Sequence, residues 1–454
     1  MSWRPLWTGE LAERAMVRAR EIAIAQAEAP TATAADRVLY WAYTTAVFDE
    51  AFANDAYGAA LDDLVASLRR GAPHLGLFGG LANGGWVLCH TLDADDSEDS
   101  LGAIDEALLR VLAVDEWRGA HDLIEGLTGF GVYFLERIDH GAGDKARDGL
   151  ARVVSHLERT ALWCEVGTNT GSSSLGATWH TPLSILPPHF AADYPDGFFD
   201  CGIAHGVPGM IGLLARASAY IDPARACALG ARRWLEATRR NDEFPSKLAG
   251  PPSANAANAS AANASNASAA NANAANANAA NANAANANAS NAANANAANA
   301  YAALRFETAR TAWCYGDPGI ALGLARRAAL DAHDAPDRNA HDAHAAIPRV
   351  DPYALALAAL QRDLASSQVI DATLCHGSAG LGHIANRFFH ATGNPAFADT
   401  ARIWFAHALE QPIADDRAFL DGSAGVGLAL IAACTDTEPA WDRLLLADLA
   451  YSES

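Results

Sequence analysis

The sequence has none of the features of a secreted or membrane-inserted protein. Its N-terminus, Met1-Ser2-Trp3-Arg4-Pro5, lacks the apolar core of a signal peptide. No uninterrupted apolar run reaches the ~18 residues of a membrane span. Positive charge is scarce, since the net charge is −21 at pH 7, which argues against a nucleic-acid partner. The seven cysteines are too few and too scattered for a disulfide framework. We expect a cytoplasmic protein without membrane insertion.

One long stretch also lacks every large apolar residue. Residues 253–300 contain only Ser, Ala and Asn. Such a segment cannot bury a core, so we predict that this low-complexity tract is disordered. The rest of the chain is long enough for two or three ordinary domains. The repeats described next favour one large closed domain instead.

A short glycine-spaced phrase recurs six times, each time before a small, apolar, helix-like stretch. The copies begin at Gly80, Gly126, Gly206, Gly316, Gly377 and Gly422. Helices that small and apolar pack deep inside a protein. Polar residues within the phrases are typical N-caps, and we expect Thr128, Asp317, Ser378 and Ser423 to cap these helices. Between the phrases, amphipathic patterns predict outer helices over Lys145–Thr160, Ala226–Arg239 and Ala401–Glu410.

Buried helices that alternate with amphipathic ones predict an all-α protein, an α/α toroid with an inner and an outer ring. The segment Trp163–Asp200 has no helical period, so we predict a smaller inserted extension of extended, loop or β character. The expected organisation is N-terminal helices of the toroid (1–74), toroid (75–162), extension (163–200), toroid (201–252), low-complexity tract (253–300) and toroid with the metal motifs (301–454).

Three potential metal ligands stand directly before two of the phrases. Cys314 precedes the glycine at 316, and Cys375 with His376 precedes the glycine at 377. Two thiols and one imidazole form a three-ligand zinc set, which leaves one position of a tetrahedral ion open to a substrate. A closed structural site needs a fourth ligand, and neither motif supplies one. The alternative is that cysteines are only small buried hydrophobes. We expect that role for Cys89, Cys164, Cys227 and Cys434.

Four further residues are candidates for the chemistry near such a metal. His205 occupies the same place in its repeat as Tyr315 and His376, and an imidazole is suited to proton transfer. Its alternative role is a core histidine bonded to backbone. Asp122 can orient a base or steady a cationic group, and its alternative role is a helix cap. Arg310, shortly before the first ligand cysteine, can point toward an anionic centre.

These phrases together resemble the lanthipeptide synthetase C family, the lanthionine cyclases and their glutathione-binding relatives. The resemblance rests on Trp313-Cys314-Tyr315-Gly316, Cys375-His376-Gly377, Ala204-His205-Gly206 and Asp122-Leu123-Ile124-Glu125-Gly126. It implies an α/α toroid with one zinc ion (Zn2+) per chain at the mouth of a central cavity. It also implies roles for particular residues: Cys314, Cys375 and His376 as ligands, His205 and Asp122 as catalytic residues, Arg310 and Tyr315 near the zinc.

The activity implied by the resemblance is the addition of peptide cysteine thiols to dehydroalanine or dehydrobutyrine, which forms thioether rings in a lanthipeptide precursor, as in antibiotic biosynthesis. The implied partners are a dehydrated precursor peptide, whose leader the extension would engage, and a lanthipeptide dehydratase. No dehydratase-like domain precedes the toroid, so we expect a free-standing cyclase. Two alternatives stay open: a glutathione-adding relative that acts on dehydrated residues, and a non-catalytic, zinc-stabilised peptide-binding scaffold.

Overall fold

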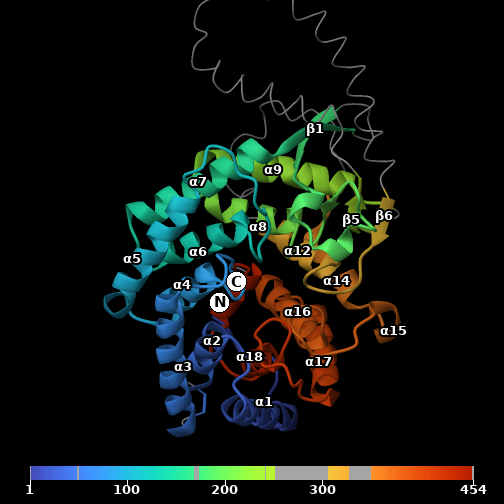
Figure 1. The fold of residues 1–454 in the computed structure, drawn as a ribbon. Helices are drawn as coiled ribbons and strands as arrows, with labels where there is room; N and C mark the ends of the chain where they lie inside the picture. The colour runs from blue at the N-terminus through green and yellow to red at the C-terminus, as the bar shows by residue number, and fades with distance from the viewer. Residues whose placement is uncertain are drawn as a thin grey trace, which may run out of the picture.

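The computed structural model describes residues 2–45, 47–48, 51–167, 173–240, 242–250, 305–326 and 349–451. The low-complexity tract at 253–300 lies outside these described residues. The described helices form two concentric rings, and the colours of Figure 1 follow the chain around them. The predicted α/α toroid is therefore confirmed.

The inner ring of the described part consists of seven helices, each packed on the next. They are α2 (Ala34–Thr45), α4 (Leu81–Thr91), α6 (Leu127–Asp139), α8 (Val207–Ala217), α12 (Asp317–Ala325), α16 (Ser378–Thr392) and α18 (Ser423–Cys434). The last helix, α18, packs against α2, and α2 packs against α4, which closes the ring. Six of the seven follow a glycine phrase as predicted. Helix α2 has no such phrase, so the repeats did not reveal it.

An outer helix packs against each inner one. The outer ring of the described part consists of α1 (Glu10–Glu28), α3 (Ala51–Arg70), α5 (Ala94–Val111), α7 (Asp144–Thr160), α9 (Asp222–Ala237), α14 (Pro352–Leu360) and α17 (Pro395–Glu410). These include the three predicted amphipathic helices, with α9 and α17 beginning earlier than expected. No helix of the described residues combines the length and the apolar character needed to cross a membrane.

The prediction of polar N-caps on the inner helices was wrong. The N-caps are the leading glycines themselves, and none of them makes a side-chain cap. A Cβ on Gly316 would overlap the carbonyl oxygen of Arg310, because the loop before each helix folds back onto the helix start. The hydroxyls fasten that loop instead: Ser378 Oγ donates to the carbonyl of Asp371 at 3.2 Å, and Thr128 Oγ1 to that of His121 at 2.6 Å.

The loops before the inner helices are also hydrogen-bonded to one another around the ring. The backbone N–H of Leu123 donates to the carbonyl of Ala204 at 3.0 Å. Farther round, the N–H of Cys314 donates to the carbonyl of Cys375 at 3.2 Å, and the N–H of Cys375 to that of Leu420 at 3.1 Å. These bonds bring the residues directly before the glycines to one face of the ring. Those residues are Glu125, His205, Tyr315, His376 and Asp421.

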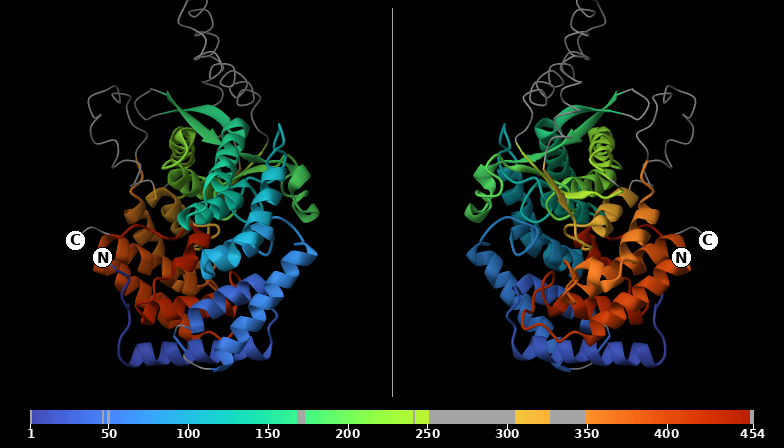
Figure 2. Two further views of the ribbon diagram at one scale, coloured as in Figure 1. Left: turned by 90° about the vertical axis from the view of Figure 1, so that its left-hand side faces the viewer. Right: turned by 90° about the vertical axis from the view of Figure 1, so that its right-hand side faces the viewer.

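The extension contributes two small antiparallel sheets on the side of the ring formed by α8 and α9 (Figure 2). The first sheet pairs β1 (Leu162–Gly167) with β2 (Ser173–Thr178), which packs on α9. The second sheet has the order β3 (His180–Thr181), β4 (Phe198–Asp200), β5 (Pro245–Ala249), β6 (Arg305–Thr308). Two short 3-10 helices, η1 (Leu183–Ile185) and η2 (Pro188–Phe190), lie between β3 and β4. Strands from beyond residue 200 thus complete this sheet, while the domain limits themselves remain a prediction.

The last part of the chain packs against inner helices. The short helix α15 (Leu364–Ser367) precedes α16, and the 3-10 helix η4 (Ala440–Leu445) follows α18. Asp442 in η4 is fully buried and accepts hydrogen bonds from His383 at 2.7 Å and from Arg387 at 2.5 Å, both on α16. Trp313 Nε1 donates to the carbonyl of Leu445 at 3.0 Å. The residue before Cys314 is therefore anchored to the core.

Candidate metal centre and adjacent pocket

The three residues predicted as metal ligands lie together. One potential ligand atom from each of Cys314, Cys375 and His376 lies within 4.8 Å of the other two. The loop hydrogen bonds described above produce this arrangement, because they pair the backbone of the first cysteine with that of the second. Among the described residues, no fourth Cys, His, Asp or Glu joins this cluster. A four-coordinate ion held here would keep one position open.

The imidazole of His376 has the orientation of a metal ligand. Its Nε2 lies 3.1 Å from Oδ2 of Asp371, so this nitrogen donates its hydrogen to a carboxylate. Its Nδ1 is buried and has no hydrogen-bond partner among the described residues. The nearest carboxylate oxygen to Nδ1 is Oδ1 of Asp421, at 3.8 Å. Nδ1 is therefore available as a ligand atom, while Asp371 holds the other nitrogen as outer carboxylates hold metal-bound histidines. The donor set fits zinc: two soft thiolates and one imidazole.

The two thiols have opposite pKa shifts. The pKa of Cys314 is lowered to about 4, first by a hydrogen bond from Cys375, which outweighs burial, and then by His376 and Arg310. The pKa of Cys375 is raised by the same hydrogen bond and by burial. Arg310 lies against this pair, since its Nη2 donates to Cys314 Sγ at 3.5 Å.

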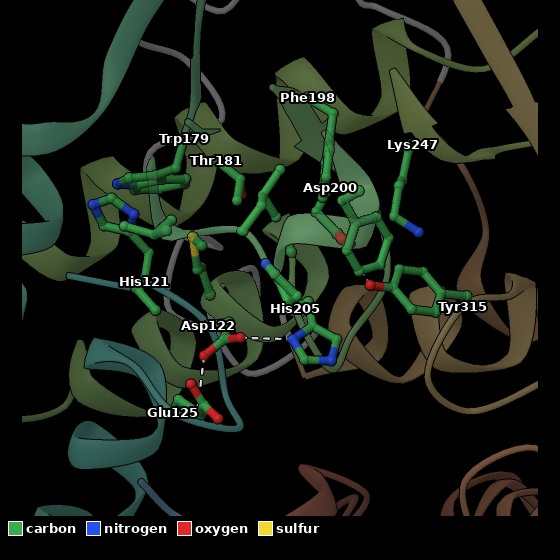
Figure 3. A pocket seen from close by; sticks show the side chains of 17 residues that line it. His121, Asp122, Glu125, Trp179, Thr181, Phe198, Asp200, His205, Lys247 and Tyr315 are labelled. Atoms are coloured by element: carbon green, nitrogen blue, oxygen red, sulfur yellow. Dashed lines mark hydrogen bonds and ion pairs between the residues drawn. The ribbon is translucent and has the colours of Figure 1, made fainter. Parts of the chain in front are cut away.

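His205 and Asp122 form a second pair on the same face. His205 Nδ1 lies 2.6 Å from Asp122 Oδ2, while Asp122 Oδ1 accepts the backbone N–H of Glu125 at 2.9 Å (Figure 3). Asp122 therefore contacts the imidazole with one oxygen and fastens the loop before α6 with the other, but it does not cap that helix, whose N-cap is Gly126. Burial lowers the pKa of His205, but the hydrogen bond and charge of Asp122 outweigh it and raise that pKa overall. Nε2 of His205 makes no hydrogen bond with any described residue, and the side chain is 42% exposed.

A pocket of about 230 Å³ opens beside this pair. One wall comes from the toroid and carries His205, Asp122 and Tyr315. The opposite wall comes from the extension and is mostly apolar: Trp179, Ile185, Leu186, Pro187, Phe190 and Phe198. The three clustered ligand residues do not line this pocket. Tyr315 links the two places, because it follows Cys314 directly and stacks on His205 with ring centroids 5.9 Å apart.

Three residues near the metal cluster and the pocket were not predicted from the sequence: Asp371, Asp200 and Lys247. Asp200 is buried and accepts the hydroxyl of Tyr315 at 2.9 Å. Burial raises the pKa of Asp200, and Lys247 and His205 oppose that rise. Asp200 and Lys247 come from adjacent strands far apart in sequence, so no local signal joins them. Asp371, shortly before His376, had a detectable signal: an Asp-x-Thr turn before the motif.

A second group of potential ligands lies at the far ends of α4 and α6 and consists of His90, Glu136 and His140. Both nitrogens of His90 are engaged, one with Glu136 at 2.7 Å and the other with the hydroxyl of Tyr43 at 2.8 Å. Glu136 also contacts Arg443 at 3.3 Å. Because a guanidinium already neutralises the carboxylate, this group is a polar network around the buried Glu136 rather than a good cation site.

A family model and a solved structure both match most of this chain. A family model described as "Lanthionine synthetase C-like protein" matches residues 38–251 and 291–446. Among solved structures, the chain is similar to "Nisin cyclase", with 16% sequence identity and a TM-score of 0.61, over 91% of this chain and 90% of that chain. At this identity the structural match supports the fold alone. No curated protein sequence matches the chain.

Proposed function

Because the chain belongs to the lanthionine synthetase C-like family, we propose that it is a zinc-dependent lanthionine cyclase. In this proposal the substrate is a dehydrated precursor peptide, and the reaction adds a cysteine thiol of that peptide to dehydroalanine or dehydrobutyrine. The product is a thioether ring, as in antibiotic lanthipeptides. The observation that carries the proposal is the three-member Cys314, Cys375 and His376 cluster with its free imidazole nitrogen.

The cluster would hold one zinc ion through two thiolates and the Nδ1 atom of His376. A zinc ion bound there would supply Lewis acidity that lowers the pKa of a substrate thiol. Asp371 would keep the His376 ring in place through its bond to Nε2. Arg310 would stabilise the negative charge of Cys314.

His205 would act as the acid that completes the addition. Addition of a thiolate to the β-carbon moves the alkene electrons toward the carbonyl, and a proton must then reach the α-carbon. His205 has a raised pKa and a free Nε2 atom on the pocket wall, as that role requires. Asp122 would hold Nδ1 of the ring and support its positive charge. Tyr315, fixed by its bond to Asp200, would hold the ring from the side.

The extension would supply the apolar wall of the pocket and engage the leader of the precursor. Its aromatic and aliphatic side chains face the His205 side of the pocket, where they would exclude water from the reacting residue. A cytoplasmic location and a partnership with a lanthipeptide dehydratase complete the proposal, since the substrate must first be dehydrated.

The experiment that tests the proposal uses a synthetic peptide with one dehydroalanine and one cysteine. Wild-type protein reconstituted with zinc should convert the cysteine into a thioether at constant peptide mass, measured as loss of thiol alkylation by mass spectrometry. His205→Ala should lose this activity, while its zinc content stays normal. Addition of supplied glutathione with the peptide cysteine left free would favour the glutathione-adding alternative. Bound but unreacted peptide would favour the scaffold.

A further inference from the structure

Lysine is nearly absent from this chain, and one of its two lysines lines the pocket. Lys and Arg total 32 residues, and only Lys145 and Lys247 are lysine. Lys145 is an ordinary surface residue on α7, paired with Glu106 at 2.8 Å, and both side chains are more than half exposed. Lys247 lies on β5 and lines the pocket with His205, Asp200 and Tyr315. Figure 3 places its amino group beside Tyr315.

The register of the second sheet puts Lys247 in the pocket. On β4, Asp200 lies directly opposite Lys247, and a register shift between Pro245 and Lys247 interrupts the pairing of β5 with β6. Irregularities of this kind re-aim a side chain next to a functional site. The ammonium group then lies over two aromatic rings, 3.9 Å from the centroid of Tyr315 and 5.6 Å from that of Phe198. Such contacts hold a cation without neutralising it.

Lys247 is not tied to a carboxylate by a direct contact. Within the described part of the chain, its amino group makes no hydrogen bond and no ion pair within 4.0 Å, and its charge acts on Asp200 only from a greater distance. The carboxylate of Asp200 already accepts the backbone N–H of Gly202 at 2.8 Å and the hydroxyl of Tyr315. On the other neighbouring strand, Glu307 accepts the hydroxyl of Tyr194 at 2.6 Å. A cation with three unused donors therefore faces the cavity.

We propose that Lys247 is a catalytic residue that stabilises the negative charge on the carbonyl oxygen of the dehydrated substrate residue during addition. This inference rests on the proposed function and adds a group to its site. Arg310 is less suited to the task, because its guanidinium contacts Cys314 and does not line the pocket. Lys247 lines the same cavity as His205. Tyr315 contacts both, with its ring centroid 3.9 Å from the amino group of Lys247 and 5.9 Å from the centroid of the His205 ring.

The step balances without any further reactant. The substrate thiol loses its proton, the new bond joins sulfur to the β-carbon, and the alkene electron pair moves through the α-carbon onto the carbonyl oxygen. Lys247 donates a hydrogen bond to that oxygen while it carries the charge. The electron pair returns as His205 gives its proton to the α-carbon, and the proton released by the thiol restores His205. The sum is addition of S–H across the double bond.

The kinetic test compares Lys247→Met with the control Lys145→Met on the dehydroalanine peptide. Removing one donor to a developing oxyanion lowers kcat by about 10²–10³-fold, so we expect that loss for Lys247→Met with KM changed by no more than about threefold. Lys145→Met should match the wild type. A normal kcat in Lys247→Met would overturn the assignment. A rise in KM alone would also overturn it, because the lysine would then bind the substrate without stabilising the transition state.

A second measurement needs no turnover and no variant. Reductive methylation of the wild-type protein, followed by peptide mapping, reports the accessibility of each lysine separately. A peptide with dehydroalanine but no cysteine should protect Lys247 and leave Lys145 fully modified. Equal modification of Lys247 with and without the peptide would refute contact between Lys247 and the peptide.

If the wild type makes no thioether, the proposed function fails and the role of Lys247 fails with it. If the wild type cyclises and Lys247→Met cyclises equally well, only the role of Lys247 fails.

Discussion

Asp371 offers the sharpest test of how this chain prepares a metal ligand. Its Oδ2 atom lies 3.1 Å from Nε2 of His376, and its Oδ1 atom accepts both the N–H and the hydroxyl of Thr373 at 2.8 Å. Asp371→Asn keeps the size of the side chain and removes its charge. The imidazole can then rotate or bind its hydrogen on Nδ1, the nitrogen that must stay free for a metal.

The expected loss follows from the exposure of this pair. Removing a partner that orients a metal-bound histidine weakens metal binding by about 10–100-fold. The side chains of His376 and Asp371 are 27% and 32% exposed. Because solvent screens part of their interaction, we expect the loss of zinc affinity to lie near the lower end of this range. We expect zinc affinity to fall about tenfold, which corresponds to about 1.4 kcal/mol.

The assay is competition for zinc with a chromogenic chelator at fixed pH, on wild type, Asp371→Asn and Thr373→Ala. Thr373→Ala removes a hydroxyl from the other oxygen of the same carboxylate and leaves the bond to His376 intact. It should change zinc affinity by less than about threefold. Unchanged affinity in Asp371→Asn, or an equal loss in both variants, would refute the orienting role.

Three other predictions concern charge. Asp122→Asn removes the hydrogen bond and the charge that raise the pKa of His205. Because protonated His205 then persists only to a lower pH, the alkaline fall of the pH–rate profile should move to lower pH. An unchanged profile would contradict the pairing of these two residues. Burial raises the pKa of Asp36 from 3.8 to about 6, so folding loses stability as pH rises through that window. Asp36→Asn should therefore raise the free energy of unfolding by about 3 kcal/mol at pH 7 and leave it unchanged below pH 3.8, as measured by urea titration. Arg387→Met removes the guanidinium that neutralises the buried carboxylate of Asp442 and leaves it with the hydrogen bond from His383. The variant should be destabilised by about 3 kcal/mol in the same titrations, and a loss below about 1 kcal/mol would contradict the pairing.

The inner ring could be predicted because its helices begin at close backbone contacts. A glycine is required wherever the preceding loop folds back onto the helix start, as at Gly316 and Gly377. Those glycines mark the sequence at each repeat. Helix α2 does not follow a glycine phrase, so the repeats did not predict it as a member of the inner ring. The hydroxyl of Ser378 was misinterpreted as a cap because its partner is the carbonyl of Asp371, and such a loop contact cannot be told from a cap by residue type.

The candidate metal cluster was easier to predict than the pocket. Its three members stand at fixed places in two adjacent repeats, so the repeat itself aligns them. Lys247 and Asp200 meet only through the pairing of β4 with β5, and strand register is set by tertiary packing rather than by local sequence. The apolar wall from the extension likewise depends on how the second sheet closes over the ring.

The most direct test of the central claim is the zinc content of the purified protein, measured by elemental mass spectrometry after reconstitution and dialysis. We predict about one zinc ion per chain in the wild type and in Cys227→Ala, which changes a buried cysteine outside the cluster. Cys375→Ala should lose the metal, because two ligands do not retain zinc against dialysis. A wild type that stays free of zinc, or a Cys375→Ala protein that keeps it, would contradict the account.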